Sequence, residues 1–189
     1  MTAIGQRDIA LTDLDEQQLI EACLAGRDGA FDLVVERHRR SVYQLCYRFV
    51  GNHEDASDLS QDVFLRAFRG LRSFRGGSSL KTWLYRIGVN VCLNKVTVRK
   101  PITEDIDVRQ HVDTLQESQV DRVLREERAV RMRAAIAQLP PKQRATLVLR
   151  MYQELSHEEI ANVLGSSVGA VKANFFHAMG NLKKILGHA

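Results

Sequence analysis

The sequence is poor in the residues that build cross-linked or metal-stapled proteins. Of its 189 residues, three are cysteine, three are proline and one is tryptophan. Cys23, Cys46 and Cys92 lie far apart, and they form neither a CxxC pair nor a metal-ligand spacing with the histidines. All three fall at apolar positions of helix-like segments, so we expect buried, reduced thiols rather than disulfides or a metal site.

Long apolar runs are absent as well. No run approaches the roughly 20 residues that a membrane-spanning helix requires. The N-terminus has no basic region followed by the apolar core of a secretion signal. With 44% hydrophobic and 26% charged residues, the composition is that of an ordinary soluble protein. We therefore expect a cytoplasmic protein without membrane insertion.

The motifs of the common enzyme classes are also missing. The sequence contains no phosphate-binding loop, no metal-ligand cluster and no nucleophile elbow. Its histidines are scattered without partners at a fixed spacing, which is typical of surface histidines. They are His38, His53, His111, His157, His177 and His188. We predict a protein that is not an enzyme, with no catalytic residue, no cofactor, no metal and no small-molecule substrate.

Charge, in contrast, is abundant and unevenly distributed. The formal net charge is only +4, but the segment from Asp62 to Lys100 has one acid, Asp62 itself, and many basic residues. The basic residues are Arg66, Arg69, Arg72, Arg75, Lys81, Arg86, Lys95, Arg99 and Lys100. This segment creates a local positive field that attracts phosphate. Residues 101–118 are acidic and lack an apolar period, so we interpret them as a linker.

Apolar periodicity predicts helices along the chain, and no strand-like alternation of any length appears. We expect helices near residues 15–24, 30–50, 53–73, 80–100, 120–139, 144–151, 158–164 and 168–186. The apolar side chains expected in the core include Leu24, Phe68, Val123, Leu124 and Met151. The predicted fold class is therefore all-α, with two small helical domains joined by the acidic linker.

The most informative stretch is the loop at residues 75–79 with the helix that follows it. Gly76 and Gly77 make the loop pliable, and a serine of the loop can cap the helix. Opposite an apolar face that includes Trp83, the helix carries Lys, Arg and Asn, which suit contacts to phosphates and base edges. A solvated amphipathic helix is the alternative interpretation. The polar residues are Lys81, Arg86, Asn90, Asn94, Lys95, Arg99 and Lys100.

A helix-turn-helix pattern lies near the C-terminus. Ser156 and Glu159 have the spacing of a capping box at the start of a short helix. Gly165 then provides a tight turn, and Ser167 can cap a longer second helix. In a helix-turn-helix protein the second helix enters the DNA major groove. A helical hairpin in a small bundle would have the same spacing.

Several motifs, taken in order, resemble those of the extracytoplasmic-function (ECF) subfamily of bacterial RNA polymerase sigma factors. Residues 55–64 (DASDLSQDVF) resemble the helix that binds core polymerase. Residues 74–78 (FRGGS) and 82–90 (TWLYRIGVN) resemble the segment that melts and reads the minus-ten element. Residues 139–144 (LPPKQR) and 158–161 (EEIA) resemble the start of the minus-thirty-five domain. Together the motifs span nearly the whole chain.

The resemblance implies an alternative sigma factor that binds core RNA polymerase and directs promoter-specific transcription initiation. The implied partners are core RNA polymerase, promoter DNA as a duplex and as a melted single strand, and an anti-sigma factor. The implied organisation is a flexible N-terminus at 1–14, an N-terminal helical domain at 15–100, the linker at 101–118 and a C-terminal helix-turn-helix domain at 119–189.

The matched motifs also imply three sets of site residues. The core polymerase-binding residues are Asp58, Gln61, Asp62, Leu65, Arg66 and Arg69. The residues that melt and read the minus-ten element are Arg75, Gly76, Gly77, Ser78, Lys81, Arg86, Asn90, Arg99 and Lys100. The residues that bind the minus-thirty-five element are Ser167, Lys172, Asn174, Phe176 and His177.

The expected recognition helix departs from the family pattern. Asn174, His177 and Met179 stand where the family usually carries arginines. We therefore predict fewer phosphate contacts and a weaker or differently specified minus-thirty-five interaction. Phe176 either contacts a thymine methyl group or belongs to the core.

Two other function classes fit parts of the sequence. A helix-turn-helix regulator that binds DNA as a dimer accounts for the C-terminal pattern, but it leaves the Gly76-Gly77 loop and the basic segment unexplained. A helical protein-interaction module accounts for the helices and predicts no dependence on DNA.

Overall fold

The computed structural model describes residues 11–74, 76–98 and 119–187, and within these residues it contains helices and no strand. The α-helices are α1 (Glu16–Leu24), α2 (Ala30–Val50), α3 (His53–Gly70), α4 (Leu80–Val98), α5 (Gln119–Ala137), α6 (Pro141–Tyr152), α7 (His157–Leu164) and α8 (Val168–Gly187). Two short 3-10 helices, η1 (Leu11–Asp13) and η2 (Leu71–Ser73), lie before α1 and after α3. None of the helices described combines the length and apolar character needed to cross a lipid bilayer.

Capping residues explain where several helices begin. Asn52 Oδ1 accepts a hydrogen bond from the backbone N–H of Asp55 at 2.8 Å and starts α3. Ser156 and Glu159 form the predicted capping box of α7, with bonds of 3.1 and 2.7 Å. Helix α6 begins at Pro141 rather than at 144, because the fixed φ angle of proline suits the first helical position.

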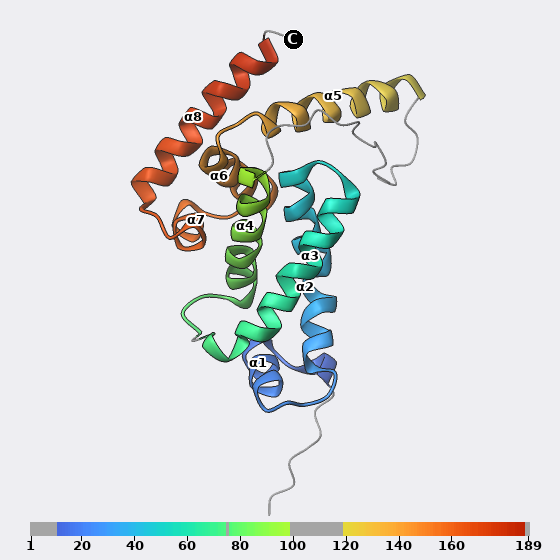
Figure 1. Cartoon of the computed structure of the whole chain (residues 1–189), viewed down its shortest axis with the longest axis vertical. Helices are drawn as coiled ribbons and strands as arrows, with labels where there is room; N and C mark the ends of the chain where they lie inside the picture. Colours follow the sequence, from blue (N-terminus) through green and yellow to red (C-terminus); the bar gives the residue numbers. More distant parts are fainter. Residues whose placement is uncertain (1–10, 75, 99–118, 188–189) are drawn as a thin grey trace, which may run out of the picture.

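The first four helices share one core. Helices α2, α3 and α4 pack against one another, and α1 lies at one end of this group (Figure 1). Leu45, Val63 and Leu84, one from each of the three packed helices, are fully buried. A Cβ atom added at Gly88 would lie only 2.9 Å from Leu45 Cδ2. The absence of a side chain at Gly88 therefore lets α4 lie close against α2.

Five apolar side chains that we expected in the core are exposed: Leu24 by 45%, Phe68 by 63%, Val123 by 54%, Leu124 by 43% and Met151 by 55%. Phe68 follows the fully buried Ala67, and one residue turns a helix by about 100°. Phe68 instead meets Phe31 edge-on, with ring centroids 5.0 Å apart. Leu24 and Met151 lie in the last turns of α1 and α6, where the packed face of each helix ends.

The three cysteines are free thiols. Cys46 and Cys92 are fully buried, and Cys23 is partly exposed. A hydrogen bond with Cys46, together with burial, raises the pKa of the Cys92 thiol. The prediction of burial is confirmed for this pair.

The last four helices form a second group that packs against the first. Helix α7 lies beside α4, and α6 lies beside α2 (Figure 1). The buried Arg144 donates from Nη1 to the backbone oxygen of Phe49 at 3.0 Å, so α6 is tied to the end of α2. Tyr85 Oη donates to Gln153 Oε1, and both side chains are buried. Two hydrogen bonds that are screened from water thus join the two groups of helices.

Candidate nucleic-acid interface

Helix α4 exposes only part of the polar set expected on it. Arg86, Asn90 and Asn94 are exposed and fall on one side of the helix, because residues four apart are neighbours on a helix surface. Lys81 lies nine residues before Asn90, which at about 100° per residue turns it to the opposite side. There its ammonium group lies 5.6 Å from the ring centroid of Tyr85. Lys81 therefore lies at the start of α4, apart from the other polar residues.

The loop before α4 is open in its middle and anchored at its beginning. Gly76 has a φ angle of +69°, and a Cβ atom at Gly76 or Gly77 would meet no atom within 4 Å. Phe74 packs against the partly buried Trp83 with ring centroids 5.2 Å apart, so Trp83 takes part in the core. The loop therefore has space for an incoming group at the two glycines. Arg75, Arg99 and Lys100, which were predicted for this surface, lie outside the described residues.

Two side chains accept hydrogen bonds at the start of α4. Ser79 Oγ accepts from the backbone N–H of Thr82 at 3.1 Å, which is the predicted serine cap. Glu16 Oε1, from the start of α1, accepts from the backbone N–H of Leu80 at 2.6 Å. Burial lowers the pKa of the nearby His38, and the Glu16 carboxylate partly opposes this shift. Sequence reasoning missed Glu16 because its partner is 64 residues away. Ser78, also in this loop, is half-buried.

Protein groups already contact two of the basic side chains of α4. Arg86 donates from Nη2 to the backbone oxygen of Asn162 in α7 at 2.7 Å. Lys95 Nζ lies 2.9 Å from Asp55 Oδ1, at the start of α3. Arg86 thus contacts the helix-turn-helix in this arrangement, and Lys95 joins α4 to α3.

The expected polymerase-binding residues lie along one side of α3. Leu65 is 55% exposed, a large exposure for an apolar side chain. Arg66 and Asp62 form an ion pair of 2.9 Å, and the hydrogen bond to Asp62 raises the pKa of Arg66. Such an exposed pair contributes little to the free energy of folding. The fold therefore does not depend on this side of α3, which is available for contact with another protein. The side comprises Asp58, Gln61, Asp62, Leu65, Arg66 and Arg69.

Helix α8 presents an exposed aromatic ring in its first half. Phe176 is 75% exposed, which rules out the core position that we considered for it. Lys172 and His177 are exposed on either side of it in the sequence, and Asn174 is half-buried. Ser167 caps the helix by accepting from a backbone N–H of the first turn at 3.2 Å. Four of the five residues expected to bind the minus-thirty-five element thus lie in the first half of α8, and Ser167 lies directly before it.

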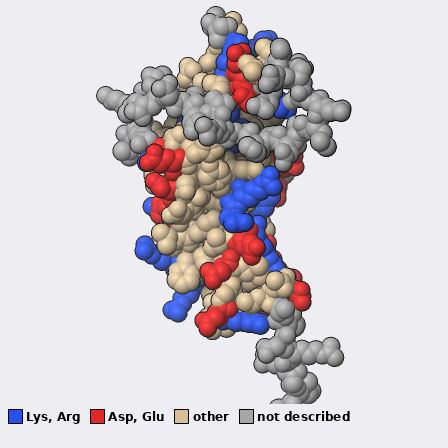
Figure 2. Space-filling view, turned by 90° about the vertical axis from the view of Figure 1, so that its right-hand side faces the viewer, with Lys and Arg blue, Asp and Glu red and all other residues tan. Residues whose placement is uncertain are grey.

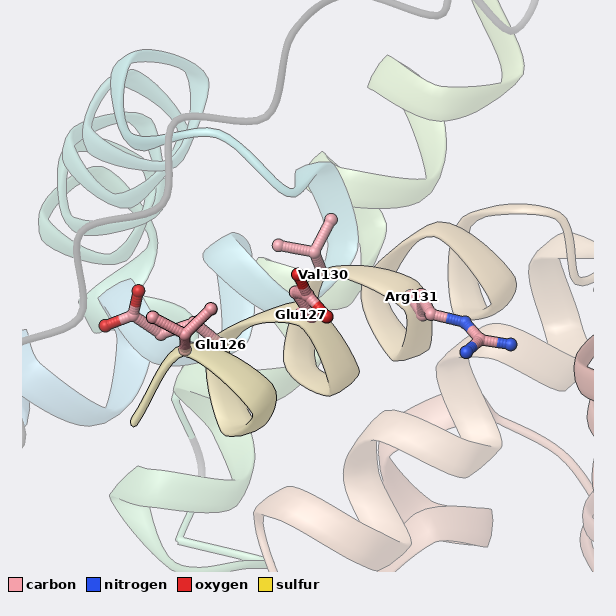
Figure 3. Close-up of a pocket in the computed structure, with 5 residues that line it drawn as sticks. Glu126, Glu127, Val130 and Arg131 are labelled. Carbon is pink, nitrogen blue, oxygen red and sulfur yellow. The ribbon is translucent and has the colours of Figure 1, made fainter. Parts of the chain in front are cut away.

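A hollow along α5 does not have the features of a ligand site. It is lined by Val123, Glu126, Glu127, Val130 and Arg131, which all belong to α5. Figure 3 shows Glu126 and Arg131 pointing in opposite directions rather than toward a common point. In the described part of the chain, no three histidine, cysteine or acidic side chains gather to hold a metal ion.

Charge on the surface is grouped by sign. On the face shown in Figure 2, small groups of basic and acidic side chains lie around a wide uncharged stretch. A field of one sign does not cover this face.

Two family models match the chain in the order of its two groups of helices. The model described as Sigma-70 region 2 matches residues 34–101, and the model described as Sigma-70, region 4 matches residues 129–182. The first match contains α3, the glycine loop and α4, and the second contains the helix-turn-helix.

Curated relatives align over nearly the whole chain. The RNA polymerase sigma-H factor of Pseudomonas aeruginosa is 36% identical, with 93% of this chain and 96% of that protein covered. The ECF RNA polymerase sigma-E factor of Escherichia coli strain K12 is 35% identical, with 87% and 91% covered. The ECF RNA polymerase sigma factor SigW of Bacillus subtilis is 32% identical, with 85% and 91% covered.

Solved structures share the arrangement of the helices. CnrH, solved in complex with the cytosolic domain of CnrY, has a TM-score of 0.69 and 25% identity, with 92% of this chain and 97% of that chain covered. RpoE of Bartonella quintana, solved with the anti-sigma factor NepR, has a TM-score of 0.62 and 21% identity, with 84% and 98% covered, which bears on the fold alone. The matches to both sigma regions and the identity to whole sigma factors lead to one conclusion: the chain belongs to the ECF family of RNA polymerase sigma factors, the alternative sigma factors that direct transcription initiation.

Proposed function

We propose that this sigma factor reads and melts the minus-ten element with the glycine loop and α4. The observation that carries the proposal is the open space at Gly76 and Gly77, directly before a helix that exposes Arg86 and Asn90. Extruding a base from a duplex costs a few kcal/mol. Backbone N–H groups of the glycine loop and Ser78 are suited to hold the extruded base, which offsets that cost.

The exposed side of α4 and the start of α4 take separate parts in this proposal. Asn90 carries an amide that reads a base edge, and Arg86 contacts phosphate. Lys81 lies on the other side of α4 near the loop, where it contacts the backbone of the strand that leaves the duplex. Arg75, Arg99 and Lys100 add positive charge at the two ends of the segment.

We propose that α8 binds the minus-thirty-five element through fewer charge contacts than an arginine-rich helix makes. Lys172 contacts phosphate, and Ser167, Asn174 and His177 contact the groove. Phe176, which is 75% exposed, packs on a thymine methyl group, an apolar contact available only in the major groove. The exposed aromatic ring supports this assignment, because water solvates it poorly in the free protein.

The exposed side of α3 is the proposed docking surface for core RNA polymerase. Leu65 supplies an apolar contact, and the other five residues of that side form a polar rim, as is usual at protein interfaces. The proposed domains are residues 15–100 and 119–189, joined by the linker at 101–118. The chain itself performs no catalytic step under this proposal, and it acts in the cytoplasm because core polymerase does.

Contact between Arg86 and phosphate requires the two groups of helices to separate. Arg86 donates to Asn162 of α7, so this side chain reaches phosphate only after that contact opens. An anti-sigma factor is the proposed regulator of the opening, since CnrH and RpoE were both solved with partner proteins. Core polymerase would hold the two domains apart by binding each of them.

The test is run-off transcription by core polymerase with and without this chain on fragments of its own genome. We expect discrete new transcripts that disappear when Asn90 and Lys81 are replaced by alanine. The control is Gln44→Ala, which truncates an exposed polar side chain of α2 and should leave the transcripts unchanged. New transcripts that persist in the Asn90→Ala, Lys81→Ala protein would overturn the assignment of promoter reading to α4.

A further inference from the structure

Helix α1 reaches across the fold to the start of α4. Glu16 is the first residue of α1 and Leu80 the first residue of α4. The Glu16 Oε1 atom accepts from the Leu80 N–H at 2.6 Å, across 64 residues of sequence. The first N–H groups of a helix have no partner within the helix, and a carboxylate there makes a charge-assisted bond that also suits the helix dipole. Glu16 therefore completes the cap of α4 from outside.

Hydrogen bonds from α2 and a capping box hold the segment that carries Glu16 in place. The Arg37 guanidinium, from α2, donates from Nη2 to the backbone oxygens of Thr12 and Leu14 at 3.0 and 2.9 Å. Asp15 forms a capping box at the start of α1, so the turn before Glu16 has a fixed direction. The segment that carries Glu16 is thus fastened to α2 and does not depend on α4 for its position.

The hydrogen bond of Glu16 fixes one end of the glycine loop. The other end is held by Phe74, which packs against Trp83. Between these ends Gly76 and Gly77 have no neighbour within 4 Å of an added Cβ atom. The freedom of the loop is therefore confined to its middle, where the proposed function requires it.

We propose that Glu16 is a positioning residue for promoter melting. Its carboxylate sets where the loop ends and α4 begins, and so presents the loop to the base that leaves the duplex. This inference rests on the proposed role of the loop. It assigns a part in melting to α1, which lies outside the Sigma-70 region 2 match. Loss of the bond should lower the ratio of open to closed promoter complexes about three- to tenfold, the factor expected for a partly exposed hydrogen bond to a charged group.

Three substitutions of Glu16 separate the effect of side-chain length from the effect of the negative charge. Glu16→Ala removes both. Glu16→Asp keeps the charge and a good first residue for α1, but it is one methylene too short to meet the Leu80 N–H at 2.6 Å. Glu16→Gln keeps the side-chain length and an oxygen acceptor but removes the charge. We expect Glu16→Asp to behave like Glu16→Ala and Glu16→Gln to retain most of the melting. Glu21→Ala, at an exposed acid of the same helix, is the control.

The assay uses holoenzyme reconstituted with core polymerase on one promoter in two forms. On the duplex form, permanganate reactivity of unpaired thymines measures melting, and filter binding measures total complex. On the promoter form whose minus-ten segment is mismatched and therefore already melted, transcription measures the steps of initiation that follow melting. Glu16→Ala should lose permanganate reactivity on the duplex with little change in total complex, and the melted template should restore its transcription to the level of the unsubstituted protein.

Each other outcome overturns a distinct claim. If Glu16→Ala remains defective on the melted template, its role is structural and the proposal fails. If Glu16→Asp melts normally while Glu16→Gln does not, charge and not position matters, and the proposal fails. Gly76→Val, which places a branched side chain at a φ angle of +69°, reports on the loop itself. Normal melting by Gly76→Val would overturn the proposed function, whereas failure of Gly76→Val beside normal melting by Glu16→Ala would overturn only the role of Glu16.

Discussion

Replacing Gly88 by alanine should destabilise the protein even though alanine favours helices. A Cβ atom at Gly88 would lie 2.9 Å from Leu45 Cδ2 and 3.7 Å from Val63 Cγ2, whereas carbon atoms in contact lie about 3.5–4.0 Å apart. Leu45 and Val63 are fully buried, so neither side chain has free space to move into. Overpacking of this kind costs about 1–3 kcal/mol.

The gain in helix propensity from glycine to alanine offsets part of that cost. In a helix interior alanine is favoured over glycine by about 0.5–1 kcal/mol. Gly88→Ala should therefore lower the free energy of unfolding by about 1 kcal/mol. Gly180→Ala is the matched control, because Gly180 lies inside α8 and an added Cβ atom meets nothing within 4 Å. It should raise the free energy of unfolding by about 0.5–1 kcal/mol.

The difference between the two variants isolates the packing of α4 against α2, since the propensity gain is common to both. Urea unfolding followed by fluorescence reports on α4 through Trp83, which is the single tryptophan of the chain. Circular dichroism reports on all the helices, including α8. Equal unfolding midpoints for Gly88→Ala and Gly180→Ala, with unchanged m-values, would refute the argument that this contact has no room for a methyl group.

Three further predictions concern α8, the pH dependence of stability and the contact between the domains. Replacing the contacted minus-thirty-five thymine by deoxyuridine removes one methyl group and should weaken holoenzyme binding about fourfold. The same replacement should not weaken the binding of holoenzyme that carries Phe176→Ala. An equal loss of affinity for both holoenzymes would argue against the methyl contact. Burial lowers the pKa of His38 below 6.5 in the folded protein. Near and below pH 6.5 the unfolded chain therefore binds more protons than the folded protein, and the contribution of His38 to the free energy of unfolding is lost as the pH falls. The decrease in unfolding free energy between pH 7.5 and 5.5 should be smaller in His38→Gln, and an unchanged decrease would contradict the reasoning. Tyr85→Phe leaves Gln153 Oε1 without its donor and should speed hydrogen exchange of the α7 amides about fivefold; unchanged exchange would show that the bond does not hold the domains together.

Local sequence patterns were sufficient to predict the helices and their capping residues. The capping box at Ser156 and Glu159 and the cap at Asn52 act within one helical turn, so the residues that make them are neighbours in the sequence. The expected helix at 30–50 has the bounds that the structure gives to α2. The motifs that identify the sigma-factor family are also contiguous, and the matches to both sigma regions confirm them.

Periodicity was less reliable for burial, because it does not tell which neighbour covers a face. Phe68 has the apolar character of a core residue, yet it lies beside the packed stripe of α3 and is 63% exposed. Tyr85 and Val89 were not expected inside, but they are buried. The reason is that α4 packs against α2 and α3 on one side and against α6 and α7 on another. A helix that packs against neighbours on two sides buries residues beyond a single apolar stripe.

The sequence by itself determined the helical fold class, the order of the two sigma regions and the residues that belong to each motif, since all of these depend on short-range pattern. Only the tertiary structure decided which side chains meet across the fold. The hydrogen bonds from Leu80 to Glu16 and from Arg144 to Phe49 join residues 64 and 95 positions apart. No spacing rule reaches over such distances, because the partners are brought together by the packing of whole helices rather than by the course of the chain between them.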